Sequence, residues 1–356
     1  MKIRSIELLR GLAALSVAVA HADSFIGGNT NLPFSRWHDY AMPGTAGVEF
    51  FFVLSGFVMA VAHGAEIGRG GHVGRFLWKR FCRIYPLFWI VLAWPIYQFW
   101  GAPSVTLAAI TQWASLLPIR TDNLIVVSWT LRQEITFYLV LSLCLLPRIG
   151  RPILVLWIAA TTVTWFIAPI QSLPGLAGIA MDHVLSKSNF EFFAGLAAGW
   201  LWRRASFGQK SGWTLLATGL ALLAWRMSRD GWGMEYGPVG ARPVYGAAYA
   251  VIILGCATLE RTGAFRFGPR AARAAWLAGA ASYPLYLVHL PVLDVVATTL
   301  GQTGTAARIG PDATFVALLA SAVLAGLLLA LAVDQPLQRV LRRLSAGSRS
   351  PRPAPG

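Results

Sequence analysis

The feature of this sequence that most limits its fold is a series of long apolar segments with few charges. A helix needs about 20 mostly apolar residues to cross the hydrocarbon core of a bilayer. Ten segments are candidates under that rule: 5–26, 45–63, 84–101, 126–147, 152–171, 188–202, 212–228, 243–260, 276–299 and 312–333. The sequence therefore predicts an all-α, polytopic integral membrane protein that uses the lipid bilayer as its solvent.

The balance of residue types agrees with this class. Apolar residues make up 56% of the chain and charged residues 13%, whereas a soluble domain carries about a quarter charged residues. The net charge of +15 is explained by basic cytoplasmic loops, so we expect no nucleic-acid partner. The three cysteines lack metal-type spacing, and we expect no metal. The N-terminus has no cleavable-signal pattern, which predicts that the first span is retained.

The basic residues give the orientation. On the ten-span map, 22 basic residues fall on the side of the N-terminus and 7 on the opposite side, while Arg132 lies within a span. Because Lys and Arg collect in cytoplasmic loops, this division predicts that both termini are cytoplasmic. Pro103 and Pro118 bracket a segment, 102–125, whose first half we interpret as an interfacial or re-entrant helix.

The chain is predicted to hold one membrane-embedded domain, 1–340. The remaining segment, 341–356, is basic and rich in proline, and we expect it to be a disordered cytoplasmic tail. Neither an internal repeat nor a nucleotide-binding glycine pattern is evident.

The first predicted span carries two ionisable residues, Arg10 and His21. A charge at mid-membrane costs at least about 2.5–3.5 kcal/mol, so each one needs a structural, transport or catalytic reason. Eleven residues return an α-helix to nearly the same direction after about 16 Å of rise. Both side chains therefore share a face, which suits a long ligand with an anionic part at Arg10 and a reacting part at His21. The alternative is a snorkelling arginine and a structural histidine.

Two more arginines, Arg80 and Arg83, lie one turn apart at the predicted cytoplasmic mouth of the third span. Such a pair can bind a phosphate through bidentate hydrogen bonds. The alternative is that both arginines only mark the cytoplasmic side.

Carboxylates and histidines recur at one predicted depth in the outer half of the membrane. His21, Glu49, Glu134 and His289 reach this depth in four different spans. Their spans also carry hydroxyl groups. Ser55 lies deeper in the span of Glu49, Tyr138 shares a face with Glu134 four residues before it, and Ser282 and Tyr286 share the face of His289. This clustering favours a common site.

These segments, taken in order, resemble the membrane-bound acyltransferase-3 family, which is found in bacterial cell-surface polysaccharide O-acetyltransferases. The resemblance covers most of the chain. It rests on Arg10 with His21, the sequence GVEFFFVLSGF at 47–57, RFCRIYP at 80–86, SWTL at 128–131 followed by Glu134, SYPLYLVH at 282–289 and DQP at 334–336. Two departures are Glu49, where Asp is frequent, and Asp334, where Glu is frequent.

The resemblance implies ten core spans in the inner membrane of a bacterial cell. It also implies an acyl-CoA donor, usually acetyl-CoA, that enters from the cytoplasm, and an acceptor hydroxyl on a sugar or another small molecule. Many relatives append an extracytoplasmic domain, which this chain lacks. It should therefore complete the transfer within the membrane domain or pass the acyl group to a partner.

Together, the residues and the resemblance assign three groups of site residues. We expect His21, Glu134 and His289 to be catalytic, Arg10, Arg80, Arg83, Ser55 and Tyr286 to hold the donor, and Glu49 and Tyr138 to bind the acceptor. His21 is the expected general base because imidazole titrates near working pH. The expected acceptor is an envelope glycan or a lipid-linked sugar. The alternatives are a diffusible acceptor such as a glycosylated antibiotic, or a transporter of sugar-like substrates.

Overall fold

The computed structural model describes residues 3–30, 32–119, 122–167, 175–230 and 241–347, and within these ranges it contains helices and no β-strand. The all-α fold class is therefore confirmed for the described chain. Each of the ten predicted spans overlaps a helix, although the last part of the fifth span, 168–171, lies outside the described residues. These helices are α1 (Arg4–Asn29), α3 (Gly47–His63), α4 (Val73–Gln98), α6 (Ser128–Cys144), α7 (Gly150–Phe166), α9 (Asn189–Arg204), α10 (Gln209–Asp230), α11 (Ala241–Arg261), α12 (Pro269–Gln302) and α13 (Thr305–Leu329).

Five helical stretches of the described chain are long and apolar enough to cross a membrane: Arg4–Gly28, His38–His63, Pro243–Arg261, Pro269–Gln302 and Thr305–Leu344. Three of the other helices, α6, α7 and α9, have only 16 or 17 residues. Such lengths lie at or just below the lower end of the range that spans a bilayer. Helix formation at all ten positions is thus confirmed, whereas the crossing of the membrane by all ten stays a prediction.

Shorter elements join these helices: α2 (His38–Ala41), η1 (Met42–Ala46), α5 (Leu107–Ser115), α8 (Gly175–Val184) and η3 (Ala330–Asp334). Helix α5 lies in the segment that was expected to hold an interfacial or re-entrant helix. It begins where the Thr106 side chain accepts a hydrogen bond from the Ala109 amide, a typical N-cap. Tyr85 of α4 then fixes its end by donating to the Ser115 carbonyl at 2.5 Å.

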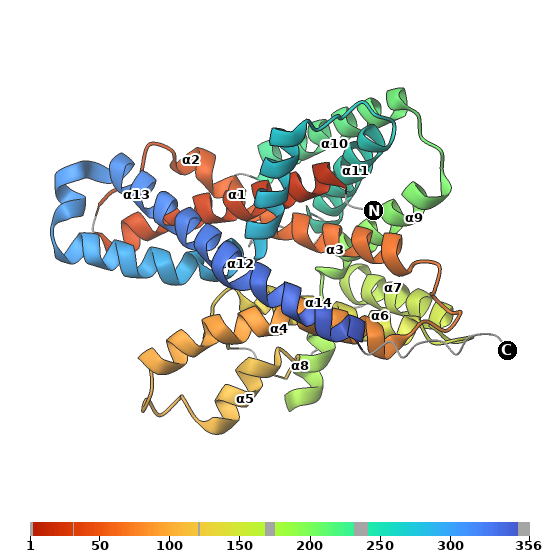
Figure 1. Ribbon diagram of the computed structural model, residues 1–356, viewed down its shortest axis with the longest axis horizontal. Helices are drawn as coiled ribbons and strands as arrows, with labels where there is room; N and C mark the ends of the chain where they lie inside the picture. The colour runs from red at the N-terminus through yellow and green to blue at the C-terminus, as the bar shows by residue number, and fades with distance from the viewer. Residues whose placement is uncertain (1–2, 31, 120–121, 168–174, 231–240, 348–356) are drawn as a thin grey trace.

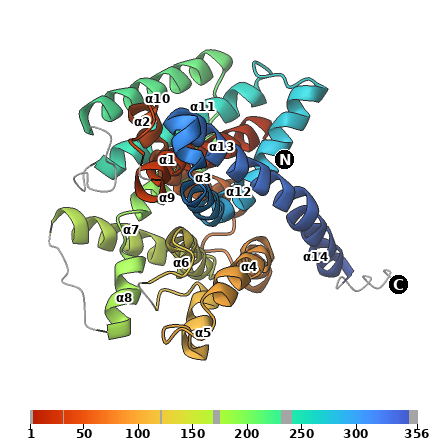
Figure 2. The same cartoon turned by 90° about the vertical axis from the view of Figure 1, so that its left-hand side faces the viewer.

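The last helix, α14 (Gln335–Gly347), crosses the expected domain boundary at 340. Leu337, Val340, Leu341 and Leu344 recur at helical spacing, and this amphipathic pattern continues the helix into the expected tail. The end of that tail, 348–356, lies outside the described residues. In Figure 2, α14 projects away from the remaining helices.

The helices form two packed groups. One contains α1, α3 and α9 to α13, and the other contains α4 to α8, as Figures 1 and 2 show. Small residues permit close helix contacts in the first group. A Cβ atom added at Gly56 of α3 would lie 2.1 Å from the Phe192 carbonyl oxygen of α9, and one at Gly195 of α9 would lie 1.9 Å from the Val53 oxygen of α3. Larger side chains there would separate the two helices.

Helices α1 and α12 run in the same direction along each other (Figure 1). Near their starts Glu7 lies against Gly279, and about four turns later His21 meets His289. This parallel packing brings His21 and His289, from two distant sequence segments, into contact, whereas Arg10 lies about three turns nearer the start of α1.

Candidate active site

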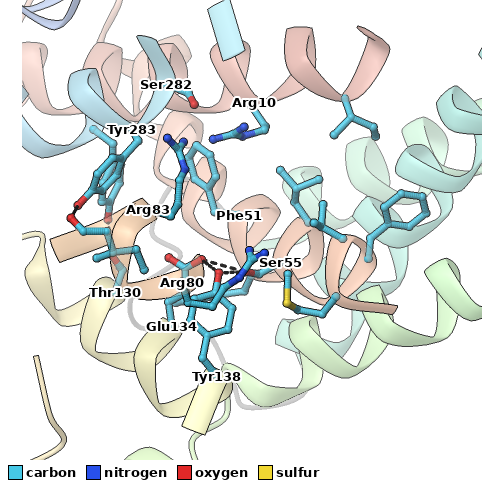
Figure 3. A pocket seen from close by; sticks show the side chains of 18 of the residues that line it. Arg10, Phe51, Ser55, Arg80, Arg83, Thr130, Glu134, Tyr138, Ser282 and Tyr283 are labelled. Atoms are coloured by element: carbon cyan, nitrogen blue, oxygen red, sulfur yellow. Dashed lines mark hydrogen bonds between the residues drawn. The ribbon is translucent and has the colours of Figure 1, made fainter. Parts of the chain in front are cut away.

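A cavity of about 570 Å³ lies where the two helix groups meet, between α1, α3, α4, α6 and α12. Figure 3 shows its polar side chains converging from these separate helices. Seven residues that were predicted for the site line it: Arg10, Ser55, Arg80, Arg83, Glu134, Tyr138 and Tyr286. It is also lined by Glu7, Thr130, Ser282 and Tyr283, which were not assigned a role from the sequence.

Three arginines give this cavity its positive character. Arg83 lies 3.6 Å from the buried Asp334 carboxylate and stacks on the Tyr283 ring at 5.4 Å. Arg80 lies 5.5 Å over the Tyr138 ring. Its buried Nε has no hydrogen-bond partner among the described residues. Neither Arg80 nor Arg10 forms an ion pair within the described chain. A buried guanidinium donor without a partner is unusual, and an anionic ligand in the cavity would satisfy it.

Glu134 lies in the same cavity, on α6. One of its oxygens accepts hydrogen bonds from Ser55 at 3.0 Å and from the Tyr138 hydroxyl, and the Ser55 and Tyr138 hydroxyls are 3.3 Å apart. These bonds, drawn in Figure 3, tie α3 to α6. The sequence placed Glu134 at the depth of the histidines. The structure instead places it with the arginines.

The two intramembrane histidines contact each other directly. His21 Nδ1 and His289 Nε2 are 3.0 Å apart, and the His289 side chain is fully buried. His289 Nδ1 lies 2.7 Å from the Tyr286 carbonyl and 3.2 Å from the Leu285 carbonyl. Carbonyls only accept hydrogen bonds, so Nδ1 of a neutral His289 carries the proton and its Nε2 is an acceptor. His21 must then donate from Nδ1, which leaves the basic lone pair on His21 Nε2.

Tyr286 connects the histidine pair with the cavity. The histidines do not line the cavity, but Tyr286 does, and its ring centroid lies 5.7 Å from that of His289. The Thr130 hydroxyl donates to the Val127 carbonyl at 2.8 Å. Thr130 must therefore accept from the Tyr286 hydroxyl, 2.9 Å away. This bond fixes the ring of Tyr286 between α6 and α12.

Two further observations complete the placement of the site residues. Glu49 is buried at the start of α3, apart from the residues that line the cavity. Among the described residues, no group of three or more His, Cys, Asp or Glu side chains is arranged to hold a metal ion.

Two of the cavity residues that were not assigned a role from the sequence, Ser282 and Tyr283, belong to the SYPLYLVH segment. Their closeness to His289 in the sequence could have indicated that they belong to the site.

The sequence of this chain is similar to those of known proteins. A family model described as "Acyltransferase domain" matches residues 3–333. The exopolysaccharide production protein ExoZ of Rhizobium meliloti (strain 1021) is 28% identical over 327 residues, which cover 85% of this chain and 93% of that protein. A protein called protein 2 in the picA locus of Rhizobium radiobacter is 40% identical over 86 residues, or 24% of this chain and 39% of that protein. No solved structure matches the chain.

Proposed function

This chain belongs to the acyltransferase-3 family and is therefore an enzyme that transfers acyl groups, and from this premise we propose its donor, its acceptor and its chemistry. The donor is acyl-CoA, most simply acetyl-CoA, which enters from the cytoplasm. The acceptor is a hydroxyl of an envelope glycan or a lipid-linked sugar. The reaction takes place inside the membrane domain.

The donor assignment depends on Arg80, whose Nε has no hydrogen-bond partner among the residues that the structure describes and which lines the arginine-rich cavity. Coenzyme A carries several phosphate charges, which guanidinium groups bind through charge-assisted hydrogen bonds. Arg10, Arg80 and Arg83 line one cavity, so they can bind a single polyanionic ligand together. The pantetheine arm then runs along α1 from Arg10 toward His21, a distance of about 16 Å by helix rise.

The chemical step uses the histidine pair. His21 Nε2 removes the proton from the acceptor hydroxyl as the hydroxyl oxygen attacks the thioester carbonyl. His289 accepts a hydrogen bond from His21 Nδ1 and so holds the reactive tautomer in place. When the carbon–sulfur bond breaks, the new oxygen ester forms, and the proton on His21 passes to the departing thiolate of coenzyme A.

The acceptor class is supported by a relative of this chain. ExoZ is described as an exopolysaccharide production protein, which favours a glycan that is built at the cell envelope. A diffusible acceptor such as a glycosylated antibiotic would use the same chemistry. Mass spectrometry of envelope glycans from wild-type and deletion cells distinguishes these acceptors, because only the first loses acyl groups on deletion. A transporter of sugar-like substrates would leave acyl-CoA intact in a thioester-consumption assay with purified protein.

Replacing Arg80 with Ala is expected to lower acyl-CoA affinity by about tenfold or more, since a hydrogen bond to a charged group contributes roughly 1.5–3 kcal/mol. Arg83→Ala should lower it less, because Arg83 also pairs with Asp334. Both losses should shrink as salt rises and screens the wild-type contact. Binding is measured by calorimetry in detergent. Arg270→Ala removes an exposed charge elsewhere and serves as control. Wild-type affinity in the Arg80 variant at low salt would show that this arginine is only a topology signal.

We also propose that all ten helices cross the inner membrane and that both termini are cytoplasmic. A membrane-impermeant maleimide should then label Thr303→Cys in intact cells but Lys210→Cys only after permeabilisation. Both positions are exposed, and the three native cysteines are buried, which keeps the background low. Labelling of both positions from one side would contradict the ten-span arrangement.

A further inference from the structure

A second cavity, of about 540 Å³, is formed by residues at the end of α3, at the start of α7, at the end of α9 and in the loop that follows α3. It shares no lining residue with the first cavity. Four arginines line it: Arg69, Arg151, Arg203 and Arg204. The remaining lining residues are small or apolar, with no carboxylate among them.

Within the described chain, these four charges are not neutralised by carboxylates. None of them forms an ion pair with a carboxylate in the described chain. Arg203 donates to the Ala60 carbonyl at 3.2 Å, and Arg204 lies 4.9 Å over the Trp200 ring. The nearby Glu66 contacts His63. Four like charges around one cavity repel each other, so the arrangement favours an anionic ligand.

The frame of this cavity is fixed by backbone hydrogen bonds. In the loop after α3, the Gly68 amide donates to the Cys144 carbonyl at 3.0 Å, and the Gly70 amide donates to the Leu145 carbonyl at 3.1 Å. The Arg148 amide in turn donates to the Gly68 carbonyl at 3.2 Å. These bonds attach the loop that carries Arg69 to the end of α6 and to the turn before α7, so the backbone around Arg69 is held in a set position.

The surroundings indicate what kind of anion fits. Trp200 is half exposed beside the arginines, and on α7 Val155 and Leu156 expose about two thirds of their surface. Exposed tryptophan next to cations is typical of the membrane interface, and basic pockets between membrane helices on the cytoplasmic side bind anionic lipid head groups. On the proposed topology, Arg151, Arg203 and Arg204 lie at the cytoplasmic ends of their helices and Arg69 lies in the cytoplasmic loop after α3. The apolar surface of α7 then faces the lipid tails.

We propose that this second cavity binds the phosphate head group of an anionic phospholipid of the cytoplasmic leaflet. The guanidinium groups bind the phosphodiester, and the acyl chains lie on the exposed face of α7. The proposal rests on the proposed membrane orientation but not on the acyl-transfer chemistry, so the two can fail separately.

The test is native mass spectrometry of the detergent-purified full chain with added phosphatidylglycerol or, at equal concentration, zwitterionic phosphatidylcholine. The wild type should retain phosphatidylglycerol preferentially. Arg69→Gln/Arg151→Gln should lower that retention by about tenfold or more, because charge-assisted contacts to the phosphate are lost. The control Arg270→Gln/Arg273→Gln removes two exposed charges from the same predicted side and should behave like wild type.

Two other measurements test the lipid site. Arg204→Gln removes one cation without touching a backbone hydrogen bond of the loop, and it should give an intermediate loss if the double variant proves unstable. Inorganic phosphate and coenzyme A are added as competitors. If phosphate or coenzyme A displaces the lipid only when the competitor is far more concentrated than the lipid, the result supports a site for the lipid head group. Equal retention by wild type and the double variant, an equal loss in the control, or binding of coenzyme A in place of the lipid would overturn it.

Discussion

Replacing His21 with alanine is expected to lower the rate of acyl transfer by about 10²–10⁴, the usual effect of a lost general base. The hydrogen bonds around His289 place the basic lone pair on His21 Nε2, so alanine removes the atom that we propose takes the acceptor proton. Donor affinity should change little, because the arginines that we propose bind the donor phosphates line the cavity, whereas His21 does not. Single-turnover rates and donor dissociation constants, measured separately, check both statements.

His289 offers the matched comparison for this prediction. His289→Ala should lower the rate less than His21→Ala, because it removes only the acceptor that orients His21. His289→Gln should restore part of the loss, since an amide oxygen can accept from His21 Nδ1. A dead His289→Ala enzyme beside a nearly normal His21→Ala enzyme would reverse the two roles. Normal turnover in both variants would remove the histidine pair from the chemistry.

The contact between His21 and His289 was only partly predictable from the sequence. Helical spacing predicted that Arg10 and His21 share a face, and span boundaries predicted that both histidines lie at one depth, which agrees with their contact. Neither observation specifies the direction in which a helix runs or which helices pack beside it. The contact follows from parallel packing of α1 on α12, whose close approach depends on small residues such as Gly11 against Ala278.

Glu134 shows where reasoning from depth was insufficient. Counting residues from the ends of its span placed it with the histidines, but depth does not specify which way a side chain points. Ser55 on α3 and Tyr138 on α6 supply two hydroxyl donors on the side of the arginines. A carboxylate in a region of low polarity is stabilised by such donors and by nearby cations. Tyr138 belongs to the same segment and was evident from its spacing, but Ser55 and the arginines come from other helices, so the segment of Glu134 did not reveal them.

Glu134→Ala has the second large expected effect, a loss of turnover of about 10², because two hydrogen bonds to a charged group contribute roughly 1.5–3 kcal/mol each. Without the carboxylate, the Ser55 and Tyr138 hydroxyls lose their common acceptor and the wall of the cavity between α3 and α6 is no longer fixed. Glu134→Gln keeps one acceptor oxygen and should lose less. Rates are measured with saturating donor, and donor dissociation constants are measured on the same preparations.

The direction of the change in donor affinity separates this role from one in acceptor binding or proton transfer. Glu134 contributes a negative charge to the cavity that holds Arg10, Arg80 and Arg83, so it opposes the binding of a polyanion. Its removal should leave acyl-CoA affinity unchanged or raise it, most clearly at low salt, where charges are least screened. Weaker donor binding in both variants would mean that the carboxylate orders the arginines rather than opposing the donor. Unchanged turnover in Glu134→Ala would contradict a role for this carboxylate in the reaction, although it lines the cavity.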